Sequence, residues 1–413
     1  MKDHLPKDTF LRDYTLNVLV DTYKSFGFER IETPCMENLN LLNNGDSGEN
    51  QKMIYKVLKR GTKLDLTKTI TSEKDITSEG MRFDLTVPLG RFYANNIDKL
   101  PMPFKSIQYG PVWRAERPQK GRFRQFMQCD IDIIGEESQM AELDLILATC
   151  SALKRLDFDD IIVRINDRNI LTAIVVEYAG FSHENQQKVF IILDKLDKIG
   201  MHGVEEELKK ENFDLKAIDK LLNFIQVMNN TTDMKQKVNL LPNILDKEIV
   251  ESLEFVLKTV EKNNINIIFD LNLVRGMGYY TGQIFEIEYP GYNSSIAGGG
   301  RYDKMISKYL NKDIPACGFS IGFERIISIL EDKNFTIPIN KDKIALIVTK
   351  DQYKDSAEQI YNHSEELRNN GNIVSCLFRR KNMHKQLEDL KMQNYTKFII
   401  YNGPDSMELK SID

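Results

Sequence analysis

The feature that most constrains the fold of this chain is a change in apolar periodicity along its length. Residues 81–135 alternate strand-like runs with charged turns, whereas residues 165–262 carry apolar side chains at helical spacing and little strand signal. Strand-like runs return at 265–270 and 283–289. The chain is therefore expected to fold as a strand-rich part that is interrupted by a helical insertion.

The C-terminal part of the chain shows a third pattern of expected elements. Strand-like runs at 344–349, 373–377 and 398–401 alternate with helical patterns, which is typical of a small α/β domain. A linker at 333–342 precedes these runs. We therefore expect a separate α/β domain over residues 341–413.

Local signals predict two further helices and a short strand. The apolar spacing indicates a helix over residues 8–28, and a short strand at 30–33 is expected to stop at Pro34. Ser138 is expected to cap a helix over residues 139–156, because serine is a favoured N-cap residue.

The composition excludes several classes of protein. With 413 residues, 41% hydrophobic and 28% charged, the chain has the make-up of an ordinary globular protein of two or three domains. Its five cysteines and five histidines are scattered without ligand spacing, so neither a disulfide framework nor a protein-bound metal site is expected. The net charge of −5 argues against indiscriminate nucleic-acid binding but allows an RNA partner held by local basic patches.

The sequence contains no signal for secretion or membrane insertion. The charged N-terminus lacks the apolar core of a signal peptide, and no apolar run approaches the roughly 20 residues that span a bilayer. We therefore expect a cytoplasmic protein with no membrane partner.

The densest functional signal is the segment 113–128, in which basic side chains crowd around a turn between two expected strands. These side chains are Arg114, Arg117, Lys120, Arg122 and Arg124. Arginine forks suit bidentate recognition of phosphate, although a solvated hairpin tip would carry the same charges. Strand alternation also places Gln128, Asp130 and Asp132 on one face of the second strand, where a polar row indicates the floor of a pocket.

A second signal lies in the segment 273–282. It sets Arg275 and the adjacent Tyr279 and Tyr280 among three glycines. Glycines let a backbone approach a ligand closely, but they also occur in bulges and tight turns. The segment alone leaves both interpretations open.

Two weaker signals follow along the chain. The segment 297–303 contains a run of three glycines, which is little evidence by itself. In the segment 318–325 a strand leads into a helix close to Arg325, which could have a structural role or hold a phosphate.

Taken together and in this order, the four segments resemble the signature elements of the class II aminoacyl-tRNA synthetases, and within that class the histidyl-tRNA synthetase family. Residues 26–34 are similar to the class II dimer-interface motif, the hairpin 113–135 to the second motif, and residues 318–330 to the third. Residues 275–280 and 298–303 resemble two segments peculiar to the histidine enzyme. The resemblance covers nearly the whole chain.

The resemblance implies an α+β fold, with an antiparallel sheet flanked by helices, a helical insertion and a small, shortened C-terminal α/β domain. Residues 1–164 and 263–332 would form the catalytic domain, and residues 165–262 the inserted helical domain. Residues 341–413 would form a module like the family's anticodon-binding domain.

The activity that the resemblance implies is activation of histidine by ATP, followed by transfer of the histidyl group to the 3′ end of histidine tRNA. The implied partners are therefore histidine, ATP and histidine tRNA. Mg²⁺ would accompany the ATP phosphates without a predicted set of protein ligands. The family also implies a homodimer.

The resemblance carries over to particular residues. At ATP we expect Arg114, Glu116, Arg122 and Arg325. At histidine we expect Asp84, Thr86, Gln128, Asp132, Arg275, Tyr279, Tyr280 and Tyr302. Arg114, Arg275 and Arg325 would be the catalytic residues, because activation depends on positioning and on charge stabilisation at the α-phosphate.

The chain departs from the common family pattern in three places. Asp84 and Asp132 stand where many members carry glutamate, so the pocket is expected to be slightly tighter. Gly278 stands where many members carry aspartate. After Tyr401 the sequence continues for fewer residues than a typical anticodon-binding domain would need, which leaves anticodon binding open.

Two alternatives compete with a histidine enzyme. A non-catalytic histidine-binding paralogue, such as a regulatory subunit of ATP phosphoribosyltransferase, would share the catalytic fold. The persistence of Arg114, Arg275 and Arg325 favours the enzyme, since such paralogues degrade this set. A different class II ligase would leave the segment 275–280 without an explanation.

Overall fold

The computed structural model describes most of the chain. It covers residues 1–43, 50–67, 69–117, 123–242, 245–275, 279–292, 294–310, 312–338, 341–403 and 408–412. Two compact units are distinguished: residues 1–2 with 15–330, and residues 3–14 with 331–413. Each unit has its own sheet.

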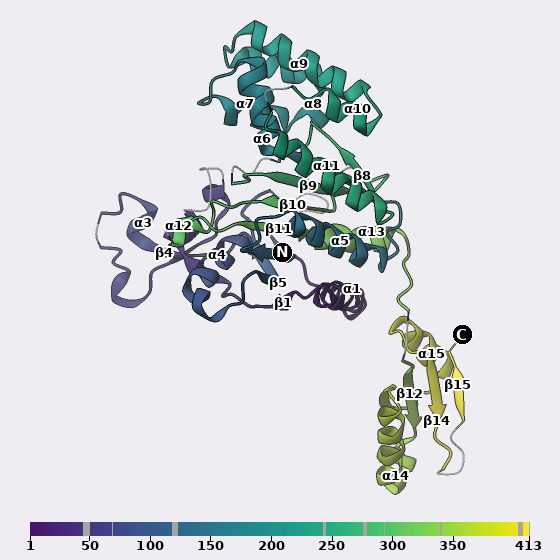
Figure 1. The fold of residues 1–413 in the computed structure, drawn as a ribbon. Coiled ribbons are helices and arrows are strands. Elements are labelled where there is room, and N and C mark those ends of the chain that lie inside the picture. The colour runs from purple at the N-terminus through teal and green to yellow at the C-terminus, as the bar shows by residue number, and fades with distance from the viewer. Residues whose placement is uncertain are drawn as a thin grey trace. The chain divides into compact units, whose positions relative to one another are not determined.

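An eight-stranded sheet organises the larger unit, in the order β1-β5-β6-β11-β10-β9-β7-β8. The strands are β1 (Glu29–Arg30), β5 (Phe104–Trp113), β6 (Gln125–Ile134), β11 (Ala316–Ile321), β10 (Ala297–Arg301), β9 (Gln283–Glu288), β7 (Ile162–Asp167) and β8 (Asn266–Phe269). All neighbours are antiparallel except the two end pairs, β1 with β5 and β7 with β8. The predicted antiparallel sheet flanked by helices is confirmed (Figure 1).

The long hairpin β5–β6 contains the polar row that the sequence pattern predicted. Its register runs from Phe104 opposite Ile134 to Trp113 opposite Gln125. Along β6 the buried Cys129, Ile131 and Ile133 alternate with the polar row. This alternation turns the polar row to the opposite face of the sheet, as the period of a strand requires.

The glycine run forms a strand in the middle of the sheet. Gly298, Gly299 and Gly300 belong to β10, which is hydrogen-bonded to β9 on one side and to β11 on the other. A Cβ on Gly299 would lie 1.9 Å from the carbonyl oxygen of Gly318 in the next strand. Only glycine allows the two backbones to come this close.

The expectation of strands and turns alone over residues 81–135 was wrong, because a helix, α4 (Thr86–Asn96), lies within it. Pro88 occupies the first turn of this helix, where a missing N–H costs no helical bond. The carboxylate of Asp84 accepts a hydrogen bond from the Val87 N–H at 3.2 Å. Asp84 therefore helps to start the helix and is held in place by it.

Helices cover the sheet of the larger unit. Residues 15–25 of the long N-terminal helix α1 (Pro6–Ser25) belong to this unit, and α5 (Met140–Lys154) and α13 (Phe323–Asp332) follow β6 and β11. The predicted cap on α5 needs a correction: its N-cap residue is Gln139, although the Ser138 hydroxyl does accept from the Met140 N–H at 3.3 Å. The strand expected at 30–33 is only β1 (Glu29–Arg30).

The predicted helical block lies between β7 and β8. It consists of α6 (Arg168–Thr172), the π-helix η4 (Ala173–Ala179), α7 (Gln186–Leu193), α8 (Leu196–Lys210), α9 (Leu215–Asn230), α10 (Met234–Asn239) and α11 (Lys247–Lys262). In Figure 1, α7 to α10 lie together beyond the β7–β9 side of the sheet. Gly180 follows η4 with φ 97°, a left-handed conformation that favours glycine, whereas Gly200 produces a kink within α8.

A small antiparallel sheet extends from the larger unit. It pairs β2 (Met36–Asn38) and β3 (Lys56–Leu58) with β4 (Thr77–Met81), and it carries the short helices α2 (Leu39–Asn43) and α3 (Glu73–Ile76). The 3₁₀ turns η1 (Asn50–Met53), η2 (Gly61–Lys63) and η3 (Ile97–Lys99) and the helix α12 (Ser307–Leu310) complete the elements of this unit.

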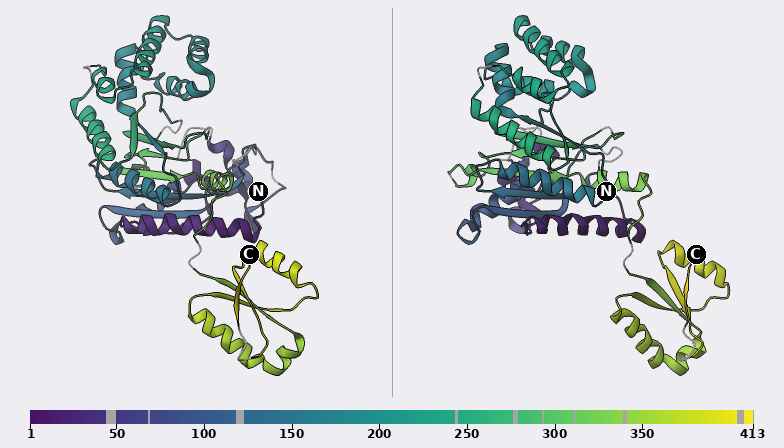
Figure 2. Two further views of the ribbon diagram at one scale, coloured as in Figure 1. Left: turned by 90° about the vertical axis from the view of Figure 1, so that its right-hand side faces the viewer. Right: turned by 45° about the vertical axis from the view of Figure 1, so that its right-hand side comes forward.

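The C-terminal unit has the expected α/β architecture. The parallel strands β12 (Lys343–Val348), β13 (Ile373–Phe378) and β14 (Lys397–Ile400) are joined by β15 (Leu409–Ser411), which runs antiparallel to β14. Ile344 and Leu346 of β12 pack with Ile360 of α14 (Lys350–Asn369), while Ala345 and Ile347 pack with Leu390 of α15 (Met383–Met392). The two helices therefore cover opposite faces of this sheet (Figure 2).

Within the described ranges, none of the helices combines the length and apolar character that crossing a membrane would require.

Candidate active site

A cavity lies on the polar face of the large sheet, above β6, β11 and β10. Of the residues predicted to bind a ligand, it is lined by Asp84, Thr86, Arg114, Glu116, Gln128, Asp132, Arg275, Tyr279, Tyr280, Tyr302 and Arg325. Segments far apart in the sequence are thus brought together as the motifs predicted. Two residues singled out in the sequence lie outside the described residues. They are Arg122, which is predicted to bind ATP, and Gly278, where many family members carry aspartate.

Asp132 lies at the bottom of the cavity. Its Oδ1 accepts a hydrogen bond of 2.5 Å from the Tyr302 hydroxyl, whereas its buried Oδ2 has no partner among the described residues. Burial raises the pKa of Asp132 to about 7, the hydrogen bond from Tyr302 opposes this shift, and the charge of Asp84 adds to it. The site therefore favours a ligand that brings a donor to Oδ2.

Asp130 adds a further carboxylate to the same row. Burial raises the pKa of Asp130 well above its usual range, and the neighbouring Asp132 raises it further. Its Oδ1 accepts a 2.5 Å hydrogen bond from the Ser320 hydroxyl. Three buried carboxylates therefore line one cavity, since Asp84 is also only 3% exposed.

Arg275 lines the same cavity and has a strained backbone conformation, with φ 53°. Its Nη1 donates to Glu286 Oε1 at 2.8 Å, while its buried Nε has no hydrogen-bond partner in the described part of the chain. The guanidinium also lies 5.6 Å from the centre of the Tyr280 ring. Arg275 is therefore fixed by its neighbours and keeps one donor for a ligand.

Three tyrosines form an aromatic wall of the cavity. The rings of Tyr279 and Tyr280 are 4.7 Å apart, and those of Tyr279 and Tyr302 are 6.0 Å apart in an edge-to-face arrangement. Burial raises the pKa of the Tyr302 hydroxyl well above its usual range, with the charge of Asp132 adding to the shift. Tyr302 is thus a dependable donor to that carboxylate.

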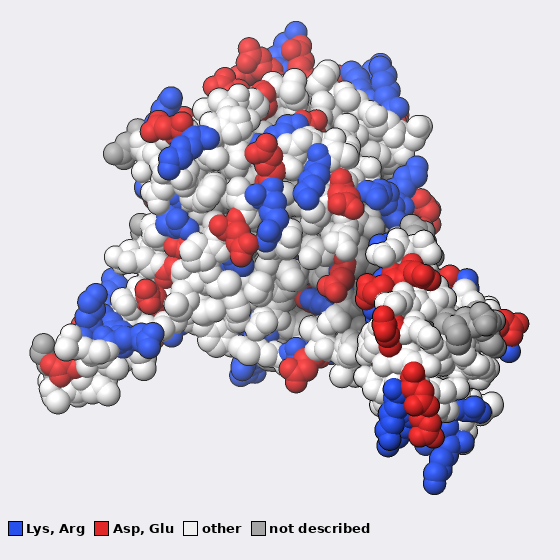
Figure 3. All heavy atoms as spheres, turned by 90° about the horizontal axis from the view of Figure 1, so that it is seen from below, with Lys and Arg blue, Asp and Glu red and all other residues white. Residues whose placement is uncertain are grey.

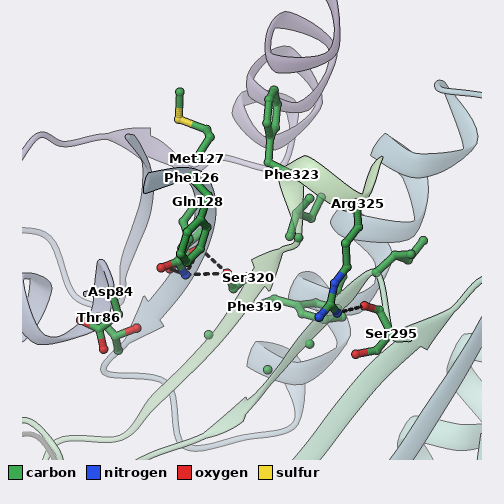
Figure 4. A pocket seen from close by; sticks show the side chains of 18 of the residues that line it. Asp84, Thr86, Phe126, Met127, Gln128, Ser295, Phe319, Ser320, Phe323 and Arg325 are labelled. Atoms are coloured by element: carbon green, nitrogen blue, oxygen red, sulfur yellow. Dashed lines mark hydrogen bonds between the residues drawn. The ribbon is translucent and has the colours of Figure 1, made fainter. Parts of the chain in front are cut away.

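Two more arginines line the remaining side of the cavity. Arg114 Nε donates to the Phe83 carbonyl at 3.1 Å, and its guanidinium lies 5.0 Å from the Phe126 ring centre. Arg325, at the start of α13, donates from Nη1 to the Ser295 carbonyl (Figure 4). These contacts fix both arginines at the cavity, where their charge suits a phosphate.

Arg301, next to the glycine run, belongs to the scaffold rather than the cavity. Its Nε and Nη2 donate to the two oxygens of the buried Glu142 at 2.6 and 2.8 Å. Arg301 Nη2 also donates to the Ser138 carbonyl at 3.0 Å. This bidentate pair fastens β10 to the start of α5.

Sequence reasoning did not assign a role to Asp130, Ser320 and Glu324, which line the cavity, or to Glu286, which contacts Arg275. Asp130 and Ser320 face each other across β6 and β11, and Glu286 orients Arg275 from β9. Glu324 accepts from the Met127 N–H at 3.1 Å. The alternation of β6 already placed Asp130 in the polar row, but the pairing of β11 with β6 that supplies Ser320 is not visible in the sequence.

Comparison with known proteins agrees with this geometry. A family model described as histidyl-tRNA synthetase matches residues 1–326. The histidine–tRNA ligase of Leifsonia xyli subsp. xyli is 43% identical over 341 residues, which are 80% of this chain and 79% of that protein. A probable histidine–tRNA ligase of Tropheryma whipplei is 36% identical over 410 residues, 97% of this chain and 94% of that protein.

Solved structures show the same fold. The crystal structure of histidyl-tRNA synthetase from Nostoc sp. PCC 7120 has a TM-score of 0.80 at 26% identity and covers 100% of this chain and 93% of its own. The structure of an ATP phosphoribosyltransferase regulatory subunit/histidyl-tRNA synthetase from Bacillus halodurans C has a TM-score of 0.75 and covers 97% of this chain and 96% of its own. Because the two sequences are only 20% identical, this likeness shows the fold alone. With its family model, its relatives and its motif residues gathered in one cavity, this chain belongs to the histidyl-tRNA synthetase family.

Proposed function

We propose that this chain is a histidine–tRNA ligase that joins histidine to ATP as histidyl-adenylate and then transfers the histidyl group to tRNA. One observation carries the proposal. Three buried polar atoms that have no hydrogen-bond partner among the described residues line the same cavity: the acceptors Asp132 Oδ2 and Gln128 Oε1, and the donor Arg275 Nε. An amino acid supplies the donors and the carboxylate that these atoms lack.

The first step would be attack of the histidine carboxylate on the α-phosphate of ATP, with pyrophosphate leaving. Negative charge develops on the phosphoryl oxygens, so fixed cations stabilise the transition state. We assign Arg114 to the α-phosphate and Arg325 to the nucleotide from the other side. Arg275 would lie between the substrate carboxylate and the α-phosphate, where its contact with Glu286 keeps it in place.

Mg²⁺ would enter with the nucleotide and reduce the negative charge of its outer phosphates. This ion usually keeps several waters and binds through substrate phosphates with one or two carboxylates. Glu116 and Glu324 are the glutamates that line the cavity. We therefore propose them as the side chains that would hold the ion, directly or through water.

The site would recognise histidine at both of its ends, the α-ammonium group and the imidazole ring. We assign Asp84, Thr86 and Gln128 to the α-ammonium, and Asp132 and Tyr280 to the two nitrogens of the imidazole ring. A site of paired polar groups rejects apolar analogues strongly, because such analogues leave its own groups unpaired. Tyr279 and Tyr302 would shape the pocket around the ring.

We also propose histidine tRNA as the second substrate. Although the net charge is −5, basic side chains gather locally, and Figure 3 shows such a group on the projection at its left, formed by the segment around β3 and α3. The exposed basic residues of this segment include Arg60, Lys63 and Lys74. Local cations of this kind are what phosphate backbones require.

A homodimer and a cytoplasmic location complete the proposal. β1 lies at one end of the large sheet and pairs with β5 alone among the described strands, so its other edge is open. The segment 26–34 that contains β1 is similar to the class II dimer motif. Symmetric pairing across this region is therefore the assembly we propose.

The rival interpretation is a non-catalytic histidine-binding paralogue, which would share the fold and bind histidine without activating it. Charging of purified histidine tRNA separates the two. The ligase should attach radiolabelled histidine to tRNA in the presence of ATP, and should attach nothing without ATP. Histidine binding without pyrophosphate exchange or tRNA charging would favour the paralogue.

A further inference from the structure

The side chain of Gln128 is held by two neighbours that no assigned role explains. Its Nε2 donates to Ser320 Oγ at 3.1 Å and lies 3.4 and 3.3 Å from the two carboxylate oxygens of Asp130. Ser320 donates in turn to Asp130 Oδ1 at 2.5 Å. The three residues therefore form a closed triangle of hydrogen bonds.

The backbone of the sheet builds this triangle. Gln128 and Asp130 are two residues apart on β6, so their side chains share one face. Ser320 on β11 is the cross-strand partner of Asp130 in the antiparallel register. The position of each member is thus fixed by the strands rather than by a mobile loop.

The triangle decides which end of the Gln128 amide faces the ligand. An amide can be placed in two ways that exchange its NH₂ group and its oxygen. Ser320 donates its only proton to Asp130 Oδ1, so an amide oxygen in the place of Nε2 would face the lone pairs of Ser320 Oγ, with two acceptors opposed. With the NH₂ group there, Oε1 is buried and has no partner in the described part of the chain, and it lies on the side of the cavity where Asp84 and Thr86 lie (Figure 4).

We infer that Asp130 and Ser320 are positioning residues: they orient the Gln128 amide so that Oε1 accepts a hydrogen bond from the α-ammonium of the substrate. This inference rests on the proposed function, since it requires an amino acid in the cavity. Asp130 acts through Gln128 rather than by touching the substrate, because its oxygens are engaged by the amide and by Ser320.

The test compares two ligands that differ in the ammonium group alone. Histidine and imidazolepropionate share the imidazole ring and the carboxylate, and only histidine carries the ammonium. Calorimetric titration of the purified full-length protein gives the affinity for histidine divided by the affinity for imidazolepropionate, and this ratio is compared between variants. Asp130→Asn should lower this ratio about tenfold, because the amide is no longer held in one orientation and its acceptor is lost for part of the time. Ser320→Ala should lower the ratio in the same direction by a smaller factor.

A second variant distinguishes orientation from general damage. In Gln128→Glu the side chain presents an oxygen whichever way it turns, so it no longer needs to be oriented. The double variant Gln128→Glu with Asp130→Asn should therefore recover a ratio within about threefold of the unmodified protein, a difference of less than 1 kcal/mol. Recovery is not expected if Asp130→Asn merely disturbs the sheet.

The outcomes separate this inference from the function on which it rests. A protein that binds neither histidine nor imidazolepropionate would overturn both. If the unmodified protein binds histidine and exchanges pyrophosphate, but Asp130→Asn leaves the ratio unchanged or weakens both ligands equally, the inference alone is wrong.

Discussion

Gly298 stands directly against Arg275, so that a Cβ built on this glycine would lie 1.8 Å from the guanidinium Nη1. The glycine thus provides the space in which the arginine is held beside Glu286. A residue of a central strand therefore controls a side chain that we assign to the chemical step.

The first prediction is that Gly298→Ala displaces Arg275 and lowers the rate of histidine-dependent pyrophosphate exchange at least tenfold, which corresponds to about 1.4 kcal/mol of barrier. The alanine methyl group and the guanidinium cannot occupy the same space. Far-UV circular dichroism should show that the fold is retained.

A double variant provides the control. If Gly298→Ala acts only through Arg275, the change should have no further effect on histidine affinity in an Arg275→Ala background. Additive losses would show that the methyl group disturbs the site in another way.

Asp132→Asn should weaken histidine binding by roughly 1.5–3 kcal/mol, because the charge-assisted hydrogen bond that the ligand would make with the buried Oδ2 is lost. ATP affinity should hardly change. Tyr280→Phe should cost less, since a neutral hydrogen bond is removed. Titration with histidine, histidinol and imidazole measures these effects, and unchanged binding of imidazole ligands to Asp132→Asn would refute the assignment.

Asp84→Asn should fail differently from Asp132→Asn, because we assign Asp84 to the ammonium group. It should weaken histidine and histidinol alike, since both carry that group, and leave imidazole unaffected. Equal losses for all three ligands would contradict the division of labour between the two carboxylates.

The same Asp132→Asn change should make the folded state more stable at high pH. Folding raises the pKa of Asp132 from its ordinary value of 3.8 to about 7, so the stability that its protonated form contributes is complete below pH 4 and is lost as the pH rises through 7. Asparagine keeps the acceptor for Tyr302 without this loss. At pH 8 the free energy of unfolding of the variant should therefore be higher by on the order of 2 kcal/mol.

Urea unfolding at pH 5 and pH 8 measures this effect. The gain in the free energy of unfolding should be larger at pH 8 than at pH 5. Asp98→Asn, at an exposed position, is the matched control and should show little dependence on pH. A gain for Asp132→Asn that is equal at both pH values would mean that the charge of this carboxylate carries no cost.

Sedimentation tests the proposed dimer. The open edge of β1 predicts a homodimer at micromolar concentration. A single species with the mass of one chain, 47.8 kDa, would rule the dimer out at that concentration.

Sequence reasoning worked best where one period dominates a segment. The alternation along β6 placed Gln128 and Asp132 on one face, and the structure has both in the cavity. The helical spacing over residues 165–262 also predicted the helices that lie between β7 and β8.

It failed where long-range pairing overrides the local signal. Helix α4 was missed because Pro88 and Gly90 weaken a helical pattern, yet the capping contact from Asp84 and burial against the sheet favour the helix. The glycine run gave no strand signal of its own, and its close contacts with β11 become visible only once the sheet is assembled.

The most direct test of the central claim is ATP–pyrophosphate exchange measured with histidine and, separately, with each other amino acid. We predict exchange with histidine alone, and its loss in Arg275→Ala while the fold remains intact. Exchange that does not depend on histidine, or that stays within about tenfold of the unmodified rate in Arg275→Ala, would contradict the account.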